Sequence, residues 1–527
     1  MNGADVLGDT LLANGVDVCF ANPGTSEMHF VAALDRRPQM RCILGLFEGV
    51  VTAAADGYSR MADKPAATLL HLGPGLANGL ANLHNAKRAR SPVVNIVGDH
   101  ATHHLQYDAP LTSDIESLAR PMSNWVGRIA LGDDVGQMTA EAISQARQTP
   151  GVSTLILPAD VAWSNVGGSS GGEPRPVSIA PQATRALPER SAIEAGVQSL
   201  RSGGRIGLLL GGQALRAPAL EWAGRIAAAT GATLLAEMFN ARIERGRGRV
   251  PVAKVLYKID ASLAQLADYE TLILIGANVP VAFFGYPGKP SSLIAEGCEV
   301  VQVAGPHHDL AATLQALAED IGASRTTASA ASAPQSSETS DLSMGPLDGE
   351  TVCRIVARRI PEGAVVCDES LTAGFSFFAH SQAAAPHDYL QLTGGAIGIG
   401  IPLAAGAAVA SPGRKVIGLQ ADGSGMYTVQ GLWTQAREGL DVVTVIFSNR
   451  AYAILHGEMA NVGVNAIGRN AARMLNLDDP ALDWVSLAKG LGVDAARATT
   501  PAAFHSLFAA AMTRPGPFLI EAVLEPS

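Results

Sequence analysis

The sequence is poor in charged and aromatic residues, which make up 16% and 5% of its 527 residues. No run of lysine or arginine stands out and the formal net charge is −10, so nucleic acid is not expected as the main partner. The five cysteines are spread widely and none has metal-ligand spacing. They indicate free thiols in a reducing compartment rather than a disulfide framework.

Signals for secretion and for a membrane anchor are also missing. The first residues include Asp5 and Asp9 but no early lysine or arginine, unlike a secretory signal. The span 389–413 has no charged residue, but Pro402 and several glycines interrupt it. A glycine-rich loop that leads into a buried helix is the better interpretation. We therefore expect a soluble, cytoplasmic protein with no membrane partner.

The sequence is rich in apolar residues, which make up 47% of it, and it contains 56 glycines. This composition is typical of compact α/β enzymes. The length predicts about three domains. We expect a first domain over 1–165, a middle domain over 190–322, a linker over 323–347 and a third domain over 348–527. The linker is predicted because 326–340 has no large apolar residue.

The first and third domains are expected to resemble each other. Residues 71–99 and 393–422 both run from a glycine-rich loop through an alanine-rich helix and Ser-Pro to an apolar strand and an aspartate. Strands alternate with helices in all three domains. We therefore predict three doubly wound, parallel-sheet α/β domains, with a Rossmann-like middle domain.

Two polar residues follow neighbouring strands near the C-terminal part of the chain. Asp422 comes after an apolar strand that begins at Lys415, and Asn449 comes after the strand 442–447. In a right-handed strand–helix–strand unit, the carboxyl ends of the two strands lie side by side. A carboxylate, an amide oxygen and a nearby main-chain carbonyl suit Mg²⁺, which takes its other ligands from phosphate. The small residues after Asp422 let main-chain N–H groups approach that phosphate.

This stretch resembles the thiamin diphosphate signature, which runs from Gly-Asp-Gly to an asparagine further along the chain. Here Ala421 replaces the first glycine and Ser448 the first asparagine of the closing pair. The resemblance implies thiamin diphosphate and Mg²⁺ as cofactors. It further implies Asp422, Asn449 and the carbonyl of Ala451 as metal ligands, and Gly423, Ser424 and Tyr452 as cofactor contacts.

Glu48 is a lone carboxylate within the apolar run 44–51. Burial there is costly unless the carboxylate has a partner or stays protonated, and it raises the pKa of a carboxyl group. The alternative is a glutamate at a strand end that faces water. The family resemblance implies that Glu48 contacts N1′ of the aminopyrimidine and promotes formation of the C2 ylid.

The loop 393–398 resembles the segment that holds the cofactor bent. The resemblance implies that the Gly395 carbonyl accepts from the 4′-amino group and that Ile397 wedges between the two rings. Asn78 and Thr372 match two further cofactor contacts. No G-x-G-x-x-G fingerprint with a helix in the right place can be found there, which disfavours a nucleotide-binding dehydrogenase.

The choice of reaction depends mainly on His71. It resembles the active-site histidine of benzoylformate decarboxylases, and Thr25 lies where those enzymes have a serine that meets the substrate carboxylate. Their second histidine has no counterpart near 282–284. A hydrogen-bonded structural histidine is the alternative for His71.

The acetolactate synthases are the second comparison. Their glutamine and lysine are missing near 110–111 and Asn124. No convincing site for FAD is found, so FAD is not expected.

The leading hypothesis is a thiamin diphosphate- and Mg²⁺-dependent 2-oxo acid decarboxylase or carboligase, which acts through the ylid and an enamine. Acetolactate synthase-type chemistry is the alternative, and a non-catalytic assembly protein with a degenerate fold is a third hypothesis. Glu48 and Asp422 lie in different domains, and in this family the two come from different chains. The resemblance therefore implies a homodimer or homotetramer, with the site between chains.

Overall fold

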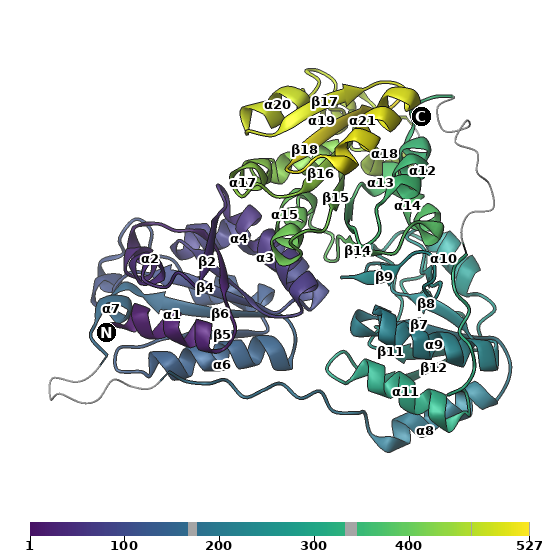
Figure 1. The fold of residues 1–527 in the computed structure, drawn as a ribbon, viewed down its shortest axis with the longest axis horizontal. Helices are drawn as coiled ribbons and strands as arrows, with labels where there is room; N and C mark the ends of the chain where they lie inside the picture. The colour runs from purple at the N-terminus through teal and green to yellow at the C-terminus, as the bar shows by residue number, and fades with distance from the viewer. Residues whose placement is uncertain (167–176, 333–344, 465, 526–527) are drawn as a thin grey trace.

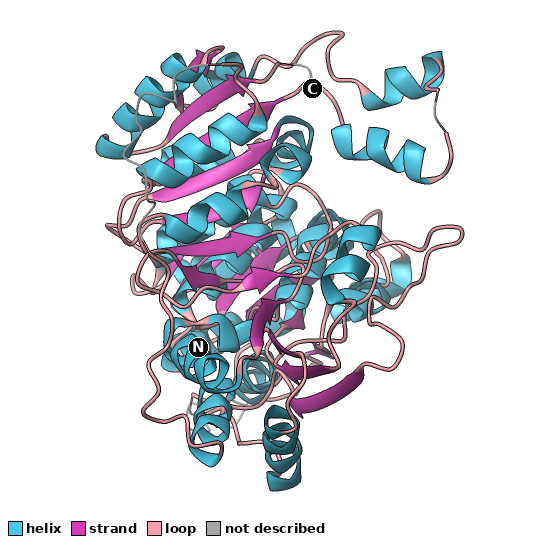
Figure 2. Ribbon diagram, turned by 90° about the vertical axis from the view of Figure 1, so that its right-hand side faces the viewer, coloured by secondary structure: helices cyan, strands magenta, loops and turns pink. Residues whose placement is uncertain are grey.

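The computed structural model describes residues 1–166, 177–332, 345–464 and 466–525, which form three α/β domains (Figure 1). The first domain lies in the purple-to-blue part of the chain, the middle domain in the teal part and the third in the green-to-yellow part. Figure 2 shows the strands layered between helices, as parallel sheets that bury both faces require. The prediction of three α/β domains with parallel sheets is confirmed.

The first domain is organised by a parallel six-stranded sheet of order β2-β1-β3-β4-β6-β5. Strands β3, β4 and β6 are buried along their whole length, as their apolar sequences predict. The strands are β1 (Val18–Asn22), β2 (Arg41–Leu44), β3 (Ala66–Leu70), β4 (Val93–Asp99), β5 (Trp125–Arg128) and β6 (Val152–Pro158). The helices are α1 (Gly3–Ala13), α2 (Met28–Asp35), α3 (Glu48–Ala62), α4 (Leu72–Ala89), α5 (Ile115–Ala119), α6 (Val135–Gln148) and α7 (Ala159–Trp163).

Two local expectations for this domain are wrong. Glu48 is not at a strand end, because β2 stops at Leu44 and Glu48 is the first residue of α3. The glycine-rich segment 72–75 is not a separate turn but the first turn of α4. In both places the helix begins earlier than propensity suggests, since glycine disfavours helix in isolation and tertiary packing overrides that preference.

The middle domain contains a parallel five-stranded sheet of order β10-β8-β7-β11-β12. Its strands are β7 (Ile206–Leu210), β8 (Thr233–Ala236), β10 (Ala253–Lys254), β11 (Thr271–Ile275) and β12 (Glu299–Ala304), and its helices are α8 (Arg190–Arg201), α9 (Ala217–Thr230), α10 (Ile259–Leu266) and α11 (Leu310–Asp320).

The segment expected to be a linker is partly packed against this domain. Ala328 packs against the core of the middle domain, and Ala331 exchanges main-chain hydrogen bonds with Gly248 and Arg249. Residues 333–344 of the expected linker lie outside the described parts of the chain.

The third domain contains a seven-stranded sheet of order β17-β18-β16-β15-β13-β14-β9. Its strands are β13 (Val365–Glu369), β14 (His387–Gln391), β15 (Val416–Ala421), β16 (Val442–Ser448), β17 (Asp494–Ala498), β18 (Phe518–Val523) and the edge strand β9 (Ile243–Arg245). Its helices are α12 (Gly349–Arg359), α13 (Leu371–Gly374), α14 (Phe377–His380), α15 (Gly400–Ala410), α16 (Asp422–Gly425), α17 (Gly431–Arg437), α18 (Ala453–Asn461), α19 (Arg469–Leu475), α20 (Trp484–Gly490) and α21 (Pro501–Thr513).

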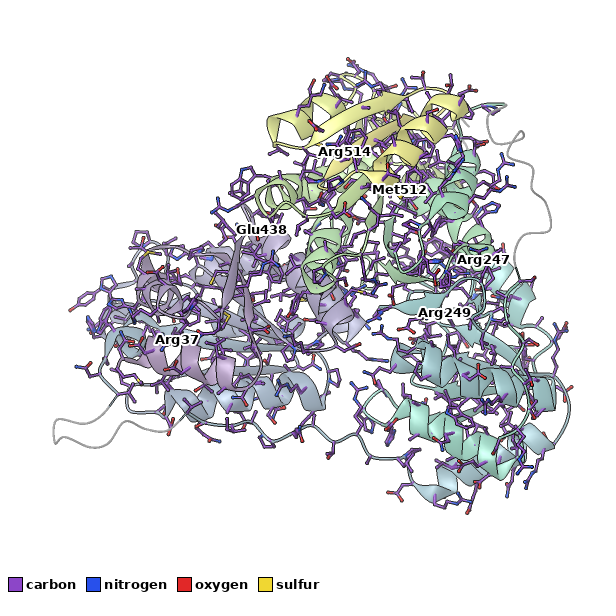
Figure 3. The ribbon with its side chains drawn as sticks, in the orientation of Figure 1. Arg37, Arg247, Arg249, Glu438, Met512 and Arg514 are labelled. Carbon is purple, nitrogen blue, oxygen red and sulfur yellow. The ribbon has the colours of Figure 1, made fainter. Side chains whose placement is uncertain are left out.

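Strand β9 was not expected in this sheet. It comes from the sequence of the middle domain and pairs antiparallel with β14. Arg247 and Arg249, just after β9, lie where the middle and third domains meet (Figure 3). The Arg247 N–H donates to the carbonyl of Ala384 at 2.8 Å, so main-chain hydrogen bonds join the two domains.

The first and third sheets share one topology. The order β2-β1-β3-β4-β6-β5 matches β14-β13-β15-β16-β18-β17 strand for strand. In this match β3 corresponds to β15 and β4 to β16, so α3 corresponds to α15. The sequence matched 71–99, which contain α4 and β4, with 393–422, which contain α15 and β15. By topology the counterparts of α15 and β15 are instead α3 and β3, one helix–strand unit earlier. The sequence match was displaced because glycine-rich loops and alanine-rich helices recur in both units.

Helices α3 and α15 pack directly against each other and join the first domain to the third. A Cβ added at Gly57 would lie 2.1 Å from the carbonyl oxygen of Leu403, and one added at Gly406 would lie 1.8 Å from that of Ala54. These glycines allow the two helix backbones to approach closely. The hydrophobic cluster around them draws residues from both domains.

The uncharged span 389–413 divides into the end of β14, a loop and helix α15, which is buried almost throughout. The prediction of a loop followed by a buried helix therefore agrees with the structure. Within the described ranges, no helix combines the length and apolar character needed to cross a bilayer.

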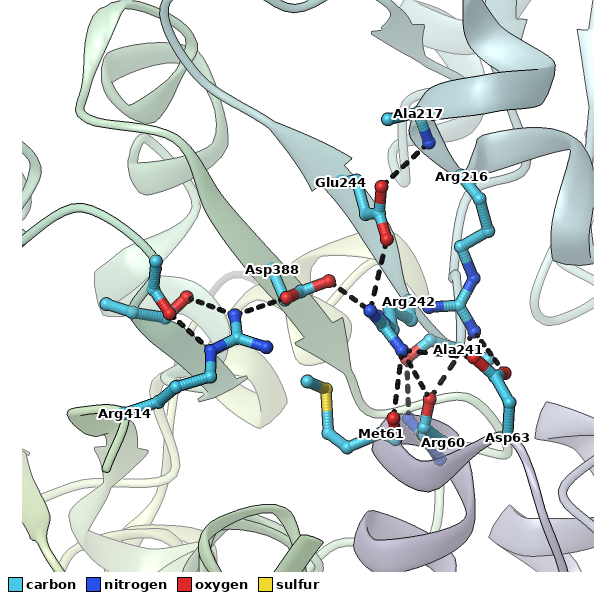
Figure 4. Close-up of polar contacts among 12 residues, drawn as sticks. Arg60, Met61, Asp63, Arg216, Ala217, Ala241, Arg242, Glu244, Asp388 and Arg414 are labelled. Atoms are coloured by element: carbon cyan, nitrogen blue, oxygen red, sulfur yellow. Dashed lines mark hydrogen bonds and ion pairs between the residues drawn. The ribbon is translucent and has the colours of Figure 1, made fainter. Parts of the chain in front are cut away.

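A buried polar network also connects the three domains (Figure 4). Arg242 of the middle domain lies 3.4 Å from Asp63 of the first domain and 2.5 Å from Asp388 of the third. Asp388 in turn pairs with Arg414. Arg242 also donates to the main-chain carbonyls of Arg60 and Met61. Arg242 and Asp388 are both buried, so removing either partner of that pair would leave an uncompensated charge.

Candidate active site

The predicted metal-binding residues lie together at the carboxyl ends of β15 and β16. Asp422 is 2% exposed, and its carboxylate accepts from the N–H groups of Gly423 at 2.8 Å and Arg450 at 2.6 Å. Burial raises the pKa of Asp422 to about 6, against the lowering effect of these hydrogen bonds. The Asn449 side chain accepts from the Ala451 N–H at 3.1 Å. A bound cation would compensate the buried charge of Asp422.

A cavity of about 370 Å³ opens beside these residues. Its lining includes the three predicted metal ligands, Asp422, Asn449 and Ala451, and every other site residue predicted in the third domain, namely Thr372, Gly395, Ile397, Gly423, Ser424 and Tyr452. These residues come from segments that follow β13, β14, β15 and β16. The structure therefore brings this part of the predicted site together at one edge of the sheet, where ligands bind in open α/β folds.

Two glycines of this cavity could not be replaced without a clash. Gly395 has φ +80°, and a Cβ there would lie 2.5 Å from Cζ of Phe283. A Cβ at Gly423 would lie 2.5 Å from Cε1 of Tyr452. Both glycines line the cavity and leave room there for an aromatic ring, Phe283 beside Gly395 and Tyr452 beside Gly423.

The hydroxyl of Ser424 is hydrogen-bonded within the loop that follows β15. The hydroxyl donates to the carbonyl of Ala421 at 3.2 Å and accepts from Gln420 at 2.6 Å. The side chain is buried at 1% exposure. Its polar capacity is therefore used to hold the loop after β15, and only its main chain is available to a phosphate.

In the first domain, Glu48 is buried beside Asn78. Glu48 is 7% exposed, and its Oε2 accepts from the Asn78 side-chain amide at 2.9 Å. A Cβ at Gly75 would lie 3.2 Å from Oε1 of Glu48, so the first turn of α4 also packs against the carboxylate. The alternative of a glutamate that faces water is wrong, because the side chain has a partner and little exposure.

His71 and Thr25 lie close to this group, at the ends of β3 and β1. Nδ1 of His71 is 2.8 Å from Oε2 of Glu27, which also accepts from the Gly24 N–H at 2.8 Å. Burial raises the pKa of Glu27, although Gly24 and His71 act against it. Thr25 is exposed in the short 3-10 helix 25–27.

Sequence reasoning missed Glu27. Its signal was available, because an acid two residues after Thr25 lies in the loop that follows β1. Strand β1 is paired with β3, which ends at Leu70, just before His71.

The two groups do not share the cavity within one chain. The residues that line it come from the middle and third domains, and neither Glu48, His71, Asn78 nor Thr25 is among them. The middle domain supplies Phe239, Tyr257, Phe283 and Phe284, and the ring centroids of Phe239 and Phe283 are 5.5 Å apart. Residues 282–284, where the sequence offers no counterpart of the second decarboxylase histidine, contribute Phe283 and Phe284 to an aromatic wall of the cavity.

The residues at these two places fit thiamin diphosphate and a hard cation. Asp422, Asn449 and the Ala451 carbonyl offer the oxygen ligands that Mg²⁺ prefers. Gly395 and Gly423 line the cavity beside these ligands. Glu48 is a buried carboxylate suited to a ring nitrogen. The fold and this set of groups define an enzyme of the thiamin diphosphate-dependent class.

Comparison with known proteins gives the family. Residues 1–118 match the model of the thiamine pyrophosphate enzyme N-terminal TPP binding domain, and residues 373–522 match that of the C-terminal TPP binding domain; thiamine pyrophosphate is thiamin diphosphate. The chain belongs to the thiamine pyrophosphate-dependent enzyme family. Members of this family act as lyases or as transferases that form C–C bonds, and the predicted enzyme class is confirmed.

Two relatives cover nearly the whole chain. A Mycobacterium tuberculosis protein, provisionally named acetolactate synthase large subunit IlvX, is 50% identical over 99% of both chains. The benzoylformate decarboxylase of Pseudomonas aeruginosa is 30% identical over 97% of both chains. This chain is thus related to both groups that the sequence suggested.

Solved structures show the same fold. The thiamine diphosphate-dependent 4-hydroxybenzoylformate decarboxylase of Rhodococcus jostii RHA1 superimposes with a TM-score of 0.86 at 24% identity over 100% of both chains. The benzoylformate decarboxylase of Polynucleobacter necessarius gives a TM-score of 0.83 at 23% identity, again over 100% of both chains. At these identities the likeness supports the fold assignment.

Proposed function

We propose that the chain is a thiamin diphosphate- and Mg²⁺-dependent enzyme that decarboxylates a 2-oxo acid in a site formed between two chains. The observation that carries this proposal is the separation of the two groups of residues. The cavity beside Asp422 and Asn449 has no carboxylate from the first domain, while Glu48 is buried outside it. A second copy that presents its first domain would complete the site in a symmetric assembly. A homodimer and a homotetramer both satisfy this requirement.

In this proposal the third domain would hold the diphosphate end of the cofactor. Asp422, Asn449 and the carbonyl of Ala451 would hold Mg²⁺ by its oxygen ligands. The main chain at Gly423 and Ser424 and the side chains of Thr372 and Tyr452 face the same cavity. The positive charge of the cation allows Asp422 to stay ionised although it is buried.

Bound thiamin diphosphate would supply an electron sink for the carbanion that remains when CO₂ leaves. Asn78 fixes the carboxyl group of Glu48, which would hold the pyrimidine ring by a hydrogen bond. The carbonyl of Gly395 would accept from the amino group of that ring, and Ile397 would pack against the cofactor. These groups orient the cofactor, which is the contribution that a protein makes to such chemistry.

His71 is the proposed proton donor and acceptor of the reaction. Glu27 contacts Nδ1, which leaves Nε2 free to exchange a proton with the substrate or product. Thr25 is exposed nearby, where its hydroxyl can meet the substrate carboxylate. Nε2 of His71 and the hydroxyl of Thr25 are the two polar groups proposed to contact the 2-oxo acid.

The aromatic wall supports an apolar substrate side chain. Phe283 and Phe284 have ring centroids 4.7 Å apart and face the cavity together with Tyr257. Such walls favour aromatic or branched aliphatic groups through burial. The relation to the benzoylformate decarboxylase of Pseudomonas aeruginosa supports decarboxylation. Ligation to a second carbonyl, as in acetolactate synthesis, is the second candidate, because the 50% identical relative bears that name.

An assay of a panel of 2-oxo acids, which measures both CO₂ and ligated products, tests this function. We expect CO₂ release with thiamin diphosphate and Mg²⁺, and its loss in Glu48→Gln. Retained exchange of the cofactor C2 proton in Glu48→Gln would contradict the role of Glu48. A chain that shows no saturable change in tryptophan fluorescence when titrated with cofactor and Mg²⁺ would instead favour the non-catalytic alternative.

A further inference from the structure

A cavity of about 580 Å³ lies where the first domain meets the middle domain, and it shares no lining residue with the candidate active site. We call it the arginine cavity. Seven cationic side chains line it: Arg60, Lys64, Arg90, Arg147, Arg185, Arg216 and Arg242. Asp63 is the one carboxylate, and no aromatic residue is present, among the described residues of its lining. A cavity walled by one sign of charge concentrates ions of the other sign.

Three of these cations are compensated by nearby acids. Arg60 lies 2.5 Å from Asp56, and Lys64 lies 2.7 Å from Asp17. Arg242 belongs to the polar network that joins the three domains (Figure 4). These three side chains are explained by the fold and need no ligand.

Arg216 is not fully compensated. Its Nη2 lies 3.1 Å from Oδ1 of Asp63, an acid that also faces Arg242. Nε and Nη1 of Arg216 are buried with no hydrogen-bond partner in the described parts of the chain, and the side chain is 17% exposed. Burial lowers the pKa of Arg216 to about 10. A buried guanidinium with free donors is costly unless something anionic meets it.

Three more arginines lack a carboxylate partner. Arg147 donates to the main-chain carbonyl of Asn14, and Arg90 donates to that of Gly276. Arg185 makes no hydrogen bond or ion pair within the residues that the structure covers. Burial lowers the pKa of both Arg147 and Arg185. The cavity therefore holds more positive charge than its own walls neutralise.

The position of the cavity beside the middle sheet also supports a ligand-binding site. β7 lies between β8 and β11, so the chain reverses its direction of strand addition beside β7. Gly212 and Gln213, just beyond the carboxyl end of β7, line the cavity. Ligands of open α/β sheets bind outside the carboxyl ends of strands at such a switch point.

We propose that the arginine cavity binds a small phosphate-bearing anion, held by Arg147, Arg185 and Arg216. Guanidinium groups pair with phosphate oxygens through parallel N–H···O bonds, which makes phosphate the anion that this set of donors suits best. The ligand would touch both the first and the middle domain and would hold them together. This inference concerns a second site and is independent of the proposed reaction.

Isothermal titration of the full chain with pyrophosphate, in EDTA and without divalent cations, tests the proposal. We expect saturable binding that weakens at least about tenfold in Arg216→Gln and in Arg185→Gln. Arg185 is partly buried in a loop, so Arg185→Gln keeps the test open if Arg216→Gln fails to fold. Arg205→Gln is the matched control, because Arg205 is 56% exposed on the middle domain and pairs with Asp268. This control should bind as the wild type does.

Parallel titrations with orthophosphate and ADP identify the source of the phosphate. Tighter binding of ADP than of pyrophosphate supports a nucleoside diphosphate, while equal binding supports an inorganic anion. The proposal is overturned if the wild type shows no saturable binding of any of the three. It is also overturned if Arg185→Gln and Arg216→Gln bind as the wild type does while Asp422→Ala does not, since the anion would then occupy the active site.

Discussion

Nδ1 of His71 lies 2.8 Å from Oε2 of Glu27, and the pair joins the ends of strands β3 and β1. A carboxylate at Nδ1 fixes the tautomer of a histidine and leaves Nε2 to act on a substrate. Glu27 is thus a positioning residue in the proposed site. Its Oε2 is shared between His71 and the Gly24 N–H, and its Oε1 is buried with no partner among the described residues.

Replacing Glu27 tests this pair. We expect Glu27→Gln to lower kcat about 10- to 100-fold because His71 loses its anionic partner, while the affinity for cofactor stays near that of the wild type. The ¹⁵N chemical shifts of His71 should show a changed tautomer ratio, which a purely structural role would not produce. Unchanged shifts and an unchanged rate would remove Glu27 from the site.

The buried carboxylate of Asp422 predicts a pH dependence. Its pKa is raised from 3.8 to about 6 in the folded chain, so the folded state holds the proton more tightly than the unfolded state. This contribution to stability is present below the unfolded pKa and is lost as the pH rises through about 6, by about 3 kcal/mol in all. Urea unfolding of the metal-free wild type should show this fall, and Asp422→Asn should lack it.

Metal binding should show the opposite trend with pH. A proton on Asp422 competes with Mg²⁺, so the rise in Tm given by thiamin diphosphate and Mg²⁺ should be larger at pH 7 than at pH 5. The same comparison in Asp422→Asn should give little rise at either pH. An equal rise at both pH values in the wild type would mean that the metal binds elsewhere.

The contact between α3 and α15 predicts a sensitive position at Gly406. A Cβ there would overlap the carbonyl oxygen of Ala54 at 1.8 Å, so Gly406→Val should force the helices apart and cost about 1–3 kcal/mol or more. Thermal unfolding should show a lower Tm. Gly490→Ala is the control, because a Cβ at Gly490 meets nothing within 4 Å, and its Tm should stay near that of the wild type.

The sequence predicted which third-domain residues lie together, because their arrangement is local there. Asp422 and Asn449 follow the two strands of a single strand–helix–strand unit, and parallel pairing places their ends side by side without further information. Glu48 was recognised by its family resemblance and its apolar surroundings. Its place at the start of α3 could not be seen, because tertiary packing decides where that helix begins.

Features made by distant segments could not be predicted. Strand β9 joins the third sheet although its sequence belongs to the middle domain, and no local pattern reveals such pairing. Glu27 was overlooked because its meaning depends on His71, 44 residues along the chain. The uncompensated charge of Arg216 likewise depends on which carboxylates the fold brings near it.

Mixing two inactive variants tests the central claim most directly. Glu48→Gln lacks the first-domain carboxylate, and Asp422→Ala lacks the third-domain metal ligand. If the site is shared between chains, a mixed dimer contains one intact site, and re-equilibrated equimolar mixtures should regain about a quarter of wild-type CO₂ release. Native mass spectrometry checks that mixed dimers have formed. No recovery of activity in a sample that contains them would contradict the account.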